Sequence, residues 1–150
     1  MKNISVTIQD IKETGYSYKP LPPDLEVSFG KNLKFGMGFQ FKIDNENDIF
    51  KFSTIINYMI NGYEGDFLNF SNTITFKVTN LSNAIIEEEG GFMKIKDDLI
   101  VSLAAVCIGT TRGLLAANTK GTDWAKFPVP ILDPKQVVEE MNRLKDENNG

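Results

Sequence analysis

The sequence has 150 residues, of which 41% are hydrophobic and 24% are charged, a balance typical of one globular domain (residues 1–150). A net charge of −4 and only two arginines, Arg112 and Arg143, argue against binding to nucleic acid or acidic membranes, which requires a basic face. The absence of histidine removes the most frequent acid–base group at neutral pH and the most frequent transition-metal ligand.

Three features of the sequence bear on the cellular compartment of the protein: the start of the chain, the length of its apolar runs and its cysteine content. Met1 leads directly into an alternating segment, so we expect no signal peptide. The longest mainly apolar run, Leu99 to Ile108, is shorter than the ~20 residues of a membrane span, so we expect no membrane insertion. Cys107 is the only cysteine, which excludes an internal disulfide. The sequence therefore predicts a cytoplasmic protein.

The first part of the chain predicts strands. Apolar residues alternate with polar ones from Ile4 to Ile8, and this strand could reach Ile11. Residues 13–24 contain three prolines and one glycine, which predicts an irregular or edge segment. A short alternating piece covers 25–29, and a perfect alternation from Leu33 to Ile43 predicts a strand with one buried face.

The middle of the chain continues the sheet. Residues 44–48 are polar and predict a hairpin turn into a strand over 50–60. This strand has apolar residues on both faces, which predicts a position either central in the sheet or at an interface. A loop is expected over 61–72 and a further strand over 73–79. The acidic run and the glycines at 87–91 are expected to end the sheet.

Two helices follow. Asp97 and Asp98 favour a helix start, and the segment from Leu99 to Ala117 has helical character. Asp133 is predicted to be the N-cap of a second, amphipathic helix with Pro134 at its first position. The sequence thus predicts an α+β fold: an antiparallel sheet of four or five strands, followed by a long and a short C-terminal helix packed on one face of the sheet.

The long helix is apolar nearly all the way round, so it is either enclosed or shared between subunits. One sheet encloses little, and we therefore favour an oligomer interface over simple burial. Cys107 is expected to act as a small buried hydrophobe and not as a reactive thiol. The predicted interface residues are Leu99, Leu103, Val106, Cys107 and Thr110.

Polar groups suggest no catalytic, metal or cofactor site. Glu87, Glu88 and Glu89 are adjacent and do not converge in a strand, while residues 44–48 lack the central glycine and distal glutamate of a calcium loop. No strand–glycine-rich loop–helix unit predicts a phosphate site. An enzyme that uses carboxylates such as Asp66 or Asp123 is the weakest hypothesis, because no convergent pair supports it.

The segment between the helices, WAKFPVPI (124–131), combines aromatic residues with two prolines. Prolines stiffen an extended segment, which can lay its apolar side chains over apolar surface. The segment could be a clamp that holds the second helix on the sheet, or the wall of a groove that accepts an apolar segment of another chain. The predicted groove residues are Trp124, Phe127, Val129, Ile131, Val137 and Met141.

Three pieces stand out in the C-terminal part of the sequence: a long helix ending in Thr111-Arg112-Gly113, the crossover Phe127-Pro128-Val129-Pro130, and Asp133-Pro134 at the start of a short helix. In these pieces the sequence resembles the SecB export-chaperone family and its SecB-like relatives. In the strands only the pattern matches. The resemblance implies a homotetramer, a dimer of dimers, with the long helix at subunit interfaces. It also implies binding of unfolded or partly folded polypeptide in apolar grooves, without nucleotide or metal.

The resemblance leaves the client open. The acidic surface that docks to the SecA motor has no identified counterpart in this sequence, so docking to the translocase stays open. A dedicated chaperone of a toxin–antitoxin system is as plausible as a preprotein holdase. The alternative from another class is a structural or adaptor protein that keeps the fold and binds one folded partner.

Overall fold

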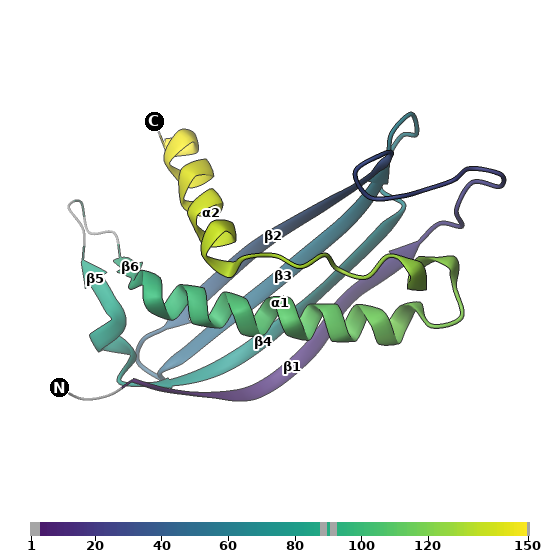
Figure 1. The fold of residues 1–150 in the computed structure, drawn as a ribbon. Helices are drawn as coiled ribbons and strands as arrows, with labels where there is room; N and C mark the ends of the chain where they lie inside the picture. The colour runs from purple at the N-terminus through teal and green to yellow at the C-terminus, as the bar shows by residue number, and fades with distance from the viewer. Residues whose placement is uncertain (1–3, 88–89, 91–92, 150) are drawn as a thin grey trace.

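A computed structural model describes residues 4–87, 90 and 93–149 (Figure 1). Strands form the first half of the chain and helices the second, as the sequence predicts. In chain order the elements are β1 (Ser5–Tyr18), β2 (Leu33–Asp44), β3 (Ile49–Ile60), β4 (Leu68–Thr79), the short η1 (Leu81–Ala84), β5 (Ile85–Glu87), β6 (Met93–Ile95), α1 (Asp97–Thr119), the short η2 (Asp123–Lys126) and α2 (Pro134–Asn149).

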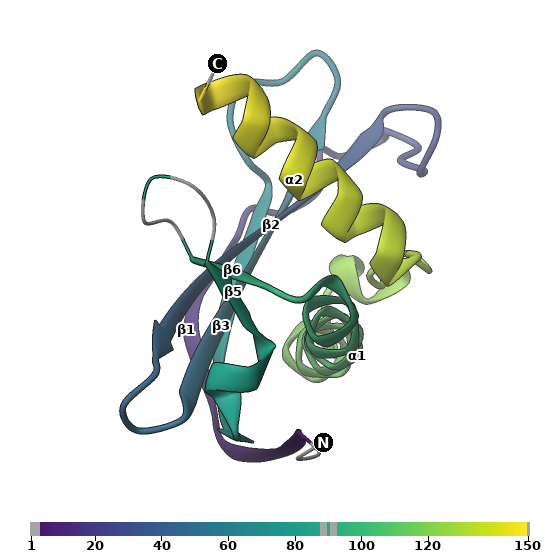
Figure 2. The same ribbon diagram turned by 90° about the vertical axis from the view of Figure 1, so that its left-hand side faces the viewer.

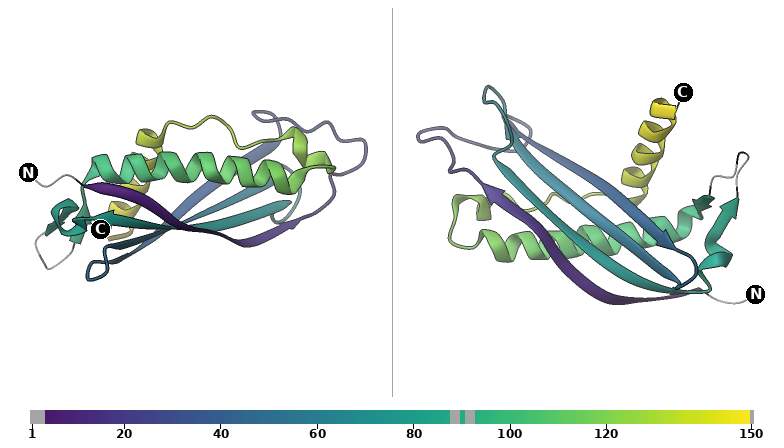
Figure 3. Two further views of the ribbon diagram at one scale, coloured as in Figure 1. Left: turned by 90° about the horizontal axis from the view of Figure 1, so that it is seen from below. Right: turned by 180° about the vertical axis from the view of Figure 1, so that it is seen from behind.

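The main sheet has four antiparallel strands in the order β1-β4-β3-β2, and β5 and β6 form a separate small hairpin. The predicted α+β architecture is confirmed, with β3 in the interior of the sheet. In the end-on view, α1 and α2 lie on the same side of the sheet (Figure 2). The opposite face carries no helix in the described part of the chain (Figure 3).

Two strands are longer than the sequence predicts. β1 continues to Tyr18 through part of the segment that was expected to be irregular, and β4 begins at Leu68 inside the predicted loop. The two extensions pair with each other, with Tyr16 opposite Phe70 and two register shifts along β1. Long-range pairing overrides the local turn signals here. The alternating piece over 25–29 forms no strand and contributes one bridge, from Phe29 to Leu33.

The core lies between the sheet and α1. Inward residues alternate strictly along β3 and β4: Phe52, Ile56 and Ile74 are fully buried, whereas their neighbours face the uncovered side. α1 runs diagonally over these strands (Figure 1). It divides the apolar side chains into two clusters, one under its N-terminal half and α2, the other around Tyr58 and Trp124.

Candidate peptide-binding surface

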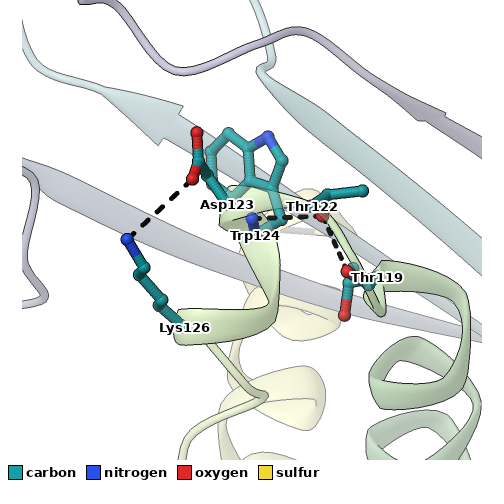
Figure 4. Close-up of polar contacts among 5 residues, drawn as sticks. All are labelled: Thr119, Thr122, Asp123, Trp124 and Lys126. Carbon is teal, nitrogen blue, oxygen red and sulfur yellow. Dashed lines mark hydrogen bonds and ion pairs between the residues drawn. The ribbon is translucent and has the colours of Figure 1, made fainter.

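The crossover segment between α1 and α2 begins at η2, which holds Trp124 (Figure 4). The hydroxyl of Thr122 accepts a hydrogen bond from the Trp124 backbone N–H at 3.2 Å and donates one to the Thr119 carbonyl at 2.7 Å. Thr122 therefore caps η2 and ties it to the end of α1. Lys126 approaches Asp123 at 3.9 Å on the exposed side.

Trp124 is anchored inside the core. Its indole stacks on the ring of Tyr58 with centroids 5.6 Å apart, and its Nε1–H donates to the Lys19 carbonyl at 2.8 Å. The Tyr58 hydroxyl in turn donates to the Phe127 carbonyl at 2.8 Å, and burial raises the pKa of this phenol. The start of the crossover is thus fixed to β3 and to the segment that follows β1.

Arg112 on α1 holds the next part of the crossover. Its Nε donates to the Val129 carbonyl at 3.1 Å and its Nη2 to the Pro130 carbonyl at 2.8 Å. These are charge-assisted bonds to a segment whose prolines cannot donate. Residues 127–130 are therefore held in one path across α1, and this path sets where α2 begins.

The structure separates the six predicted groove residues into two groups. Trp124 and Val129 are 1% and 3% exposed, so in this chain they belong to the core and act as the clamp. Phe127 is half-buried, and Val137 and Met141 are half-buried on α2. Ile131 is 97% exposed, which makes it the most prominent apolar side chain of the crossover. Only this second group is available to another chain.

β2 adds apolar surface whose exposure the sequence alone does not reveal. We call the apolar residues on its helix-facing side the β2 strip; they are Phe35, Met37, Phe39, Phe41 and Ile43. They are half-buried or, for Phe41, 39% exposed, because β2 lies at the sheet edge and α1 covers the inner strands. The alternation of residues 33–43 predicts which side chains share this face of β2, but it does not predict that the face remains partly exposed to solvent.

The β2 strip adjoins the crossover. Phe35 contacts Tyr58, with ring centroids 5.5 Å apart, and Phe29 lies edge-on to both Tyr58 and Phe127. Phe35, Met37, Phe127 and Leu132 all pack partly buried against the same cluster. A partly exposed apolar surface therefore extends from the middle of β2 to the crossover.

The predicted interface residues of α1 also divide into two groups. Leu99, Leu103 and Cys107 are buried against the sheet, Val106 is 39% exposed and Thr110 is half-buried. The outward side of α1 is formed largely by small residues: Ser102, Ala105, Gly109, Gly113 and Ala116. The all-round apolar character of α1 is thus explained in part by burial, and the outward side remains open to a partner.

By length and composition alone, α1 could cross a membrane. A core helix passes the same test, and Leu99 and Leu103 pack on the sheet. Cys107 is also enclosed there: burial raises the pKa of its thiol to about 12, and a hydrogen bond with Thr54 offsets this only partly. A thiolate at neutral pH is not available at this position.

The carboxylates considered from the sequence have structural partners. Asp66 accepts a hydrogen bond from Asn57 at 3.1 Å, and Asp123 faces Lys126. Asp44 accepts from the Asn47 side chain at 2.8 Å and closes the predicted hairpin, and this bond lowers the pKa of the carboxyl group. Glu88 and Glu89 lie outside the described residues. Among the residues that are described, no three His, Cys, Asp or Glu side chains form a metal site.

Comparison with known proteins gives no family assignment: no family model and no curated protein matches the chain. Among solved structures, the chain is similar to a protein of unknown function from Streptococcus agalactiae. The two share 16% sequence identity over 87% of this chain and 98% of the other, with a TM-score of 0.43.

Proposed function

We propose that this protein is a SecB-like chaperone that holds unfolded or partly folded polypeptide without catalysing a reaction. The binding surface consists of the β2 strip together with the exposed part of the crossover and α2: Phe127, Ile131, Val137 and Met141. The observation that carries the proposal is the partly exposed apolar surface that runs from β2 to the crossover. Apolar surface of this kind marks a contact site.

The chemistry suits a holding function. Each partly exposed aromatic or aliphatic side chain contributes a modest apolar contact, so affinity for a client accumulates over many residues. Hydrogen bonds from Tyr58 and Arg112 keep the crossover in place before a client arrives, which lowers the conformational cost of binding. We place the protein in the cytoplasm and assign it no cofactor; docking to SecA is no part of the proposal.

The proposal includes a homo-oligomer, either a dimer or a dimer of dimers. Its supporting feature is the outward side of α1, where Val106 is exposed among small residues. Small side chains let two helices approach closely, and burial of this side would remove apolar surface from water.

The function is tested by mixing the purified protein with a chemically unfolded client and following aggregation by light scattering. We expect suppression at stoichiometric amounts without nucleotide, and an oligomer in size-exclusion chromatography with light scattering. A monomer that leaves aggregation unchanged would contradict the proposal. Co-purification of one stoichiometric folded partner, and of no unfolded ones, would instead favour the adaptor function.

A further inference from the structure

Within the described residues no strand pairs with the outer edge of β2, and the pairing pattern shows which of its residues face this free edge. The backbone N–H of Asn61 donates to the Asn32 carbonyl at 2.8 Å, and the β2–β3 register continues from this pair without a shift. In an antiparallel ladder, hydrogen-bonded and non-hydrogen-bonded pairs alternate. The even-numbered residues of β2 therefore bond to β3, and the odd-numbered ones direct their N–H and C=O groups to the free edge.

The pairing of β3 with β4 independently identifies the same free-edge residues of β2. The N–H of Val78 donates to the Asp48 carbonyl at 2.8 Å, so the even-numbered residues of β3 bond to β4 and the odd-numbered ones bond to β2. Odd residues of β3 are paired with even residues of β2, for example Asn57 with Gly36. The free-edge groups of β2 thus belong to Phe35, Met37, Phe39, Phe41 and Ile43.

The two edges of the sheet differ. β1 contains two register shifts, between Ile8 and Asp10 and between Glu13 and Gly15, which interrupt its edge. β2 has no bulge and no proline along its twelve residues. Natural sheets usually protect an edge by such interruptions, and a long regular edge is a template for another strand.

Backbone and side-chain features coincide on β2. The residues with outward N–H and C=O groups are those of the β2 strip, whose apolar side chains are half-buried or exposed on the α1 side of the sheet. On the opposite side, β2 carries Lys34, Gly36, Gly38, Gln40 and Lys42. An added strand would therefore meet apolar neighbours on one face and glycine, glutamine and lysine on the other.

We infer that the client binds by adding a strand to β2, as an extended segment in which apolar residues alternate with polar or acidic ones. This inference rests on the proposed function and specifies how that site recognises its client. The free N–H and C=O groups require an extended backbone, the β2 strip selects apolar side chains at every second position, and Lys34 and Lys42 favour acidic residues between them.

The test uses a labelled synthetic peptide of about ten residues, in which valine or phenylalanine alternates with glutamate or serine. Two derivatives carry backbone N-methyl groups, one set on the apolar positions and the other on the polar positions. Only one set of N–H groups can face β2, so fluorescence anisotropy should show a loss of affinity of about tenfold or more for one derivative only. Loss on the apolar set indicates an antiparallel strand, and loss on the polar set a parallel one.

The outcomes separate the inference from the function. If the parent peptide binds and both derivatives bind equally well or equally poorly, strand addition is wrong while the holding function stands. If the parent peptide does not bind although the protein suppresses aggregation of an unfolded client, strand addition is wrong and the holding function stands; if the protein does neither, both are wrong. Amide exchange is a second measurement: binding should protect the amides of Phe35, Met37 and Phe39, whereas even-numbered amides of β2 are already protected in the free protein.

A protein variant tests the same edge. Met37→Pro removes an N–H that makes no bond to β3, and Met37→Val keeps it, so thermal unfolding should show both variants folded. Only Met37→Pro should weaken peptide binding, by about tenfold. If both variants bind as the unmodified protein does, the inference is overturned. It is also overturned if Met37→Pro abolishes self-association of the free protein, because the edge would then be occupied by a second copy.

Discussion

Asn72 on β4 donates a hydrogen bond from its side-chain amide to the Thr111 hydroxyl on α1 over 2.7 Å, and both side chains are fully buried. Thr54 lies directly opposite Asn72 in the sheet and is also fully buried. Near the end of α1, the Asn118 side-chain amide donates to Glu13 of β1 at 2.8 Å, and the Asn118 carbonyl accepts from the Tyr16 hydroxyl at 3.4 Å. The apolar contacts around these bonds are non-directional. The buried Asn72–Thr111 bond acts together with these bonds to set the position of α1 along the sheet, and with it the position of Arg112.

Loss of the Thr111 hydroxyl should destabilise the fold. Thr111→Val leaves the Asn72 amide buried without an acceptor, which should lower the free energy of unfolding by about 1–3 kcal/mol in urea denaturation. Thr110→Val is the matched control: Thr110 is half-buried beside it, and the expected change is within about 0.5 kcal/mol. The double variant Asn72→Val/Thr111→Val should regain part of the loss. Equal effects at 110 and 111 would contradict this account.

Two glycines of β2 should respond differently to alanine. A Cβ at Gly36 would lie 2.3 Å from the Asn57 side-chain oxygen, so Asn57 must move and lose its bond to Asp66. We expect Gly36→Ala to cost about 1 kcal/mol of unfolding free energy. No atom lies within 4 Å of a Cβ at Gly38, and Gly38→Ala should be neutral or stabilising by up to about 1 kcal/mol. A larger loss for Gly38→Ala would show that β2 is packed differently.

Arg112 should control the order of the crossover. Arg112→Ala removes both bonds to the Val129 and Pro130 carbonyls, and local opening of residues 127–133 should become easier by about 1.5–3 kcal/mol. Hydrogen exchange measures this directly: amides of the crossover should exchange faster, while those of β3 and β4 should not change. Arg143→Ala, on the exposed side of α2, is the charge-matched control and should leave crossover exchange unaltered.

Cys107 should make stability fall at high pH. Burial raises the pKa of its thiol to about 12 in the folded protein, above the ordinary value of 9.0, so between these pH values the unfolded state loses the proton first. The contribution of Cys107 is complete below about pH 9 and is lost as the pH rises towards 12. Burial also raises the pKa of Tyr58, so Tyr58 adds to the loss of stability at high pH. Stability measured against pH should therefore decline less steeply in Cys107→Ala, and an unchanged slope would exclude Cys107 as the cause.

Ile131 should contribute to client binding without contributing to stability. Its side chain is 97% exposed, so Ile131→Asp removes almost no packing and should leave the melting temperature unchanged. Affinity for an unfolded client should fall by about fivefold, as expected when one partly buried aliphatic contact is replaced by a charge. Ile86→Asp is the control, since Ile86 is 45% exposed on β5, away from the crossover. Equal losses would indicate a general charge effect.

Local patterns predicted most of the elements. The alternation of residues 33–43 and 50–60 corresponds to β2 and β3, and the polar turn between them is closed by Asp44. The predicted N-cap is confirmed, because the Lys135 N–H donates to the Asp133 side chain at 3.0 Å. These features depend on neighbouring residues, whose spacing sets which face a side chain occupies. The sequence by itself therefore determined the type and the apolar face of these elements.

The tertiary structure decided how far those faces are covered. Trp124 is a core residue because Lys19 and Tyr58, distant in sequence, meet it, and no local spacing encodes that meeting. The length of β1 likewise depends on its pairing with β4. Strand order places β3 inside the sheet, as the apolar residues on both of its faces predict, but the alternation of residues 33–43 did not predict that β2 lies at the edge. Alternation reports the direction of a side chain, whereas exposure depends on which element packs against it, and only the folded chain brings those elements together.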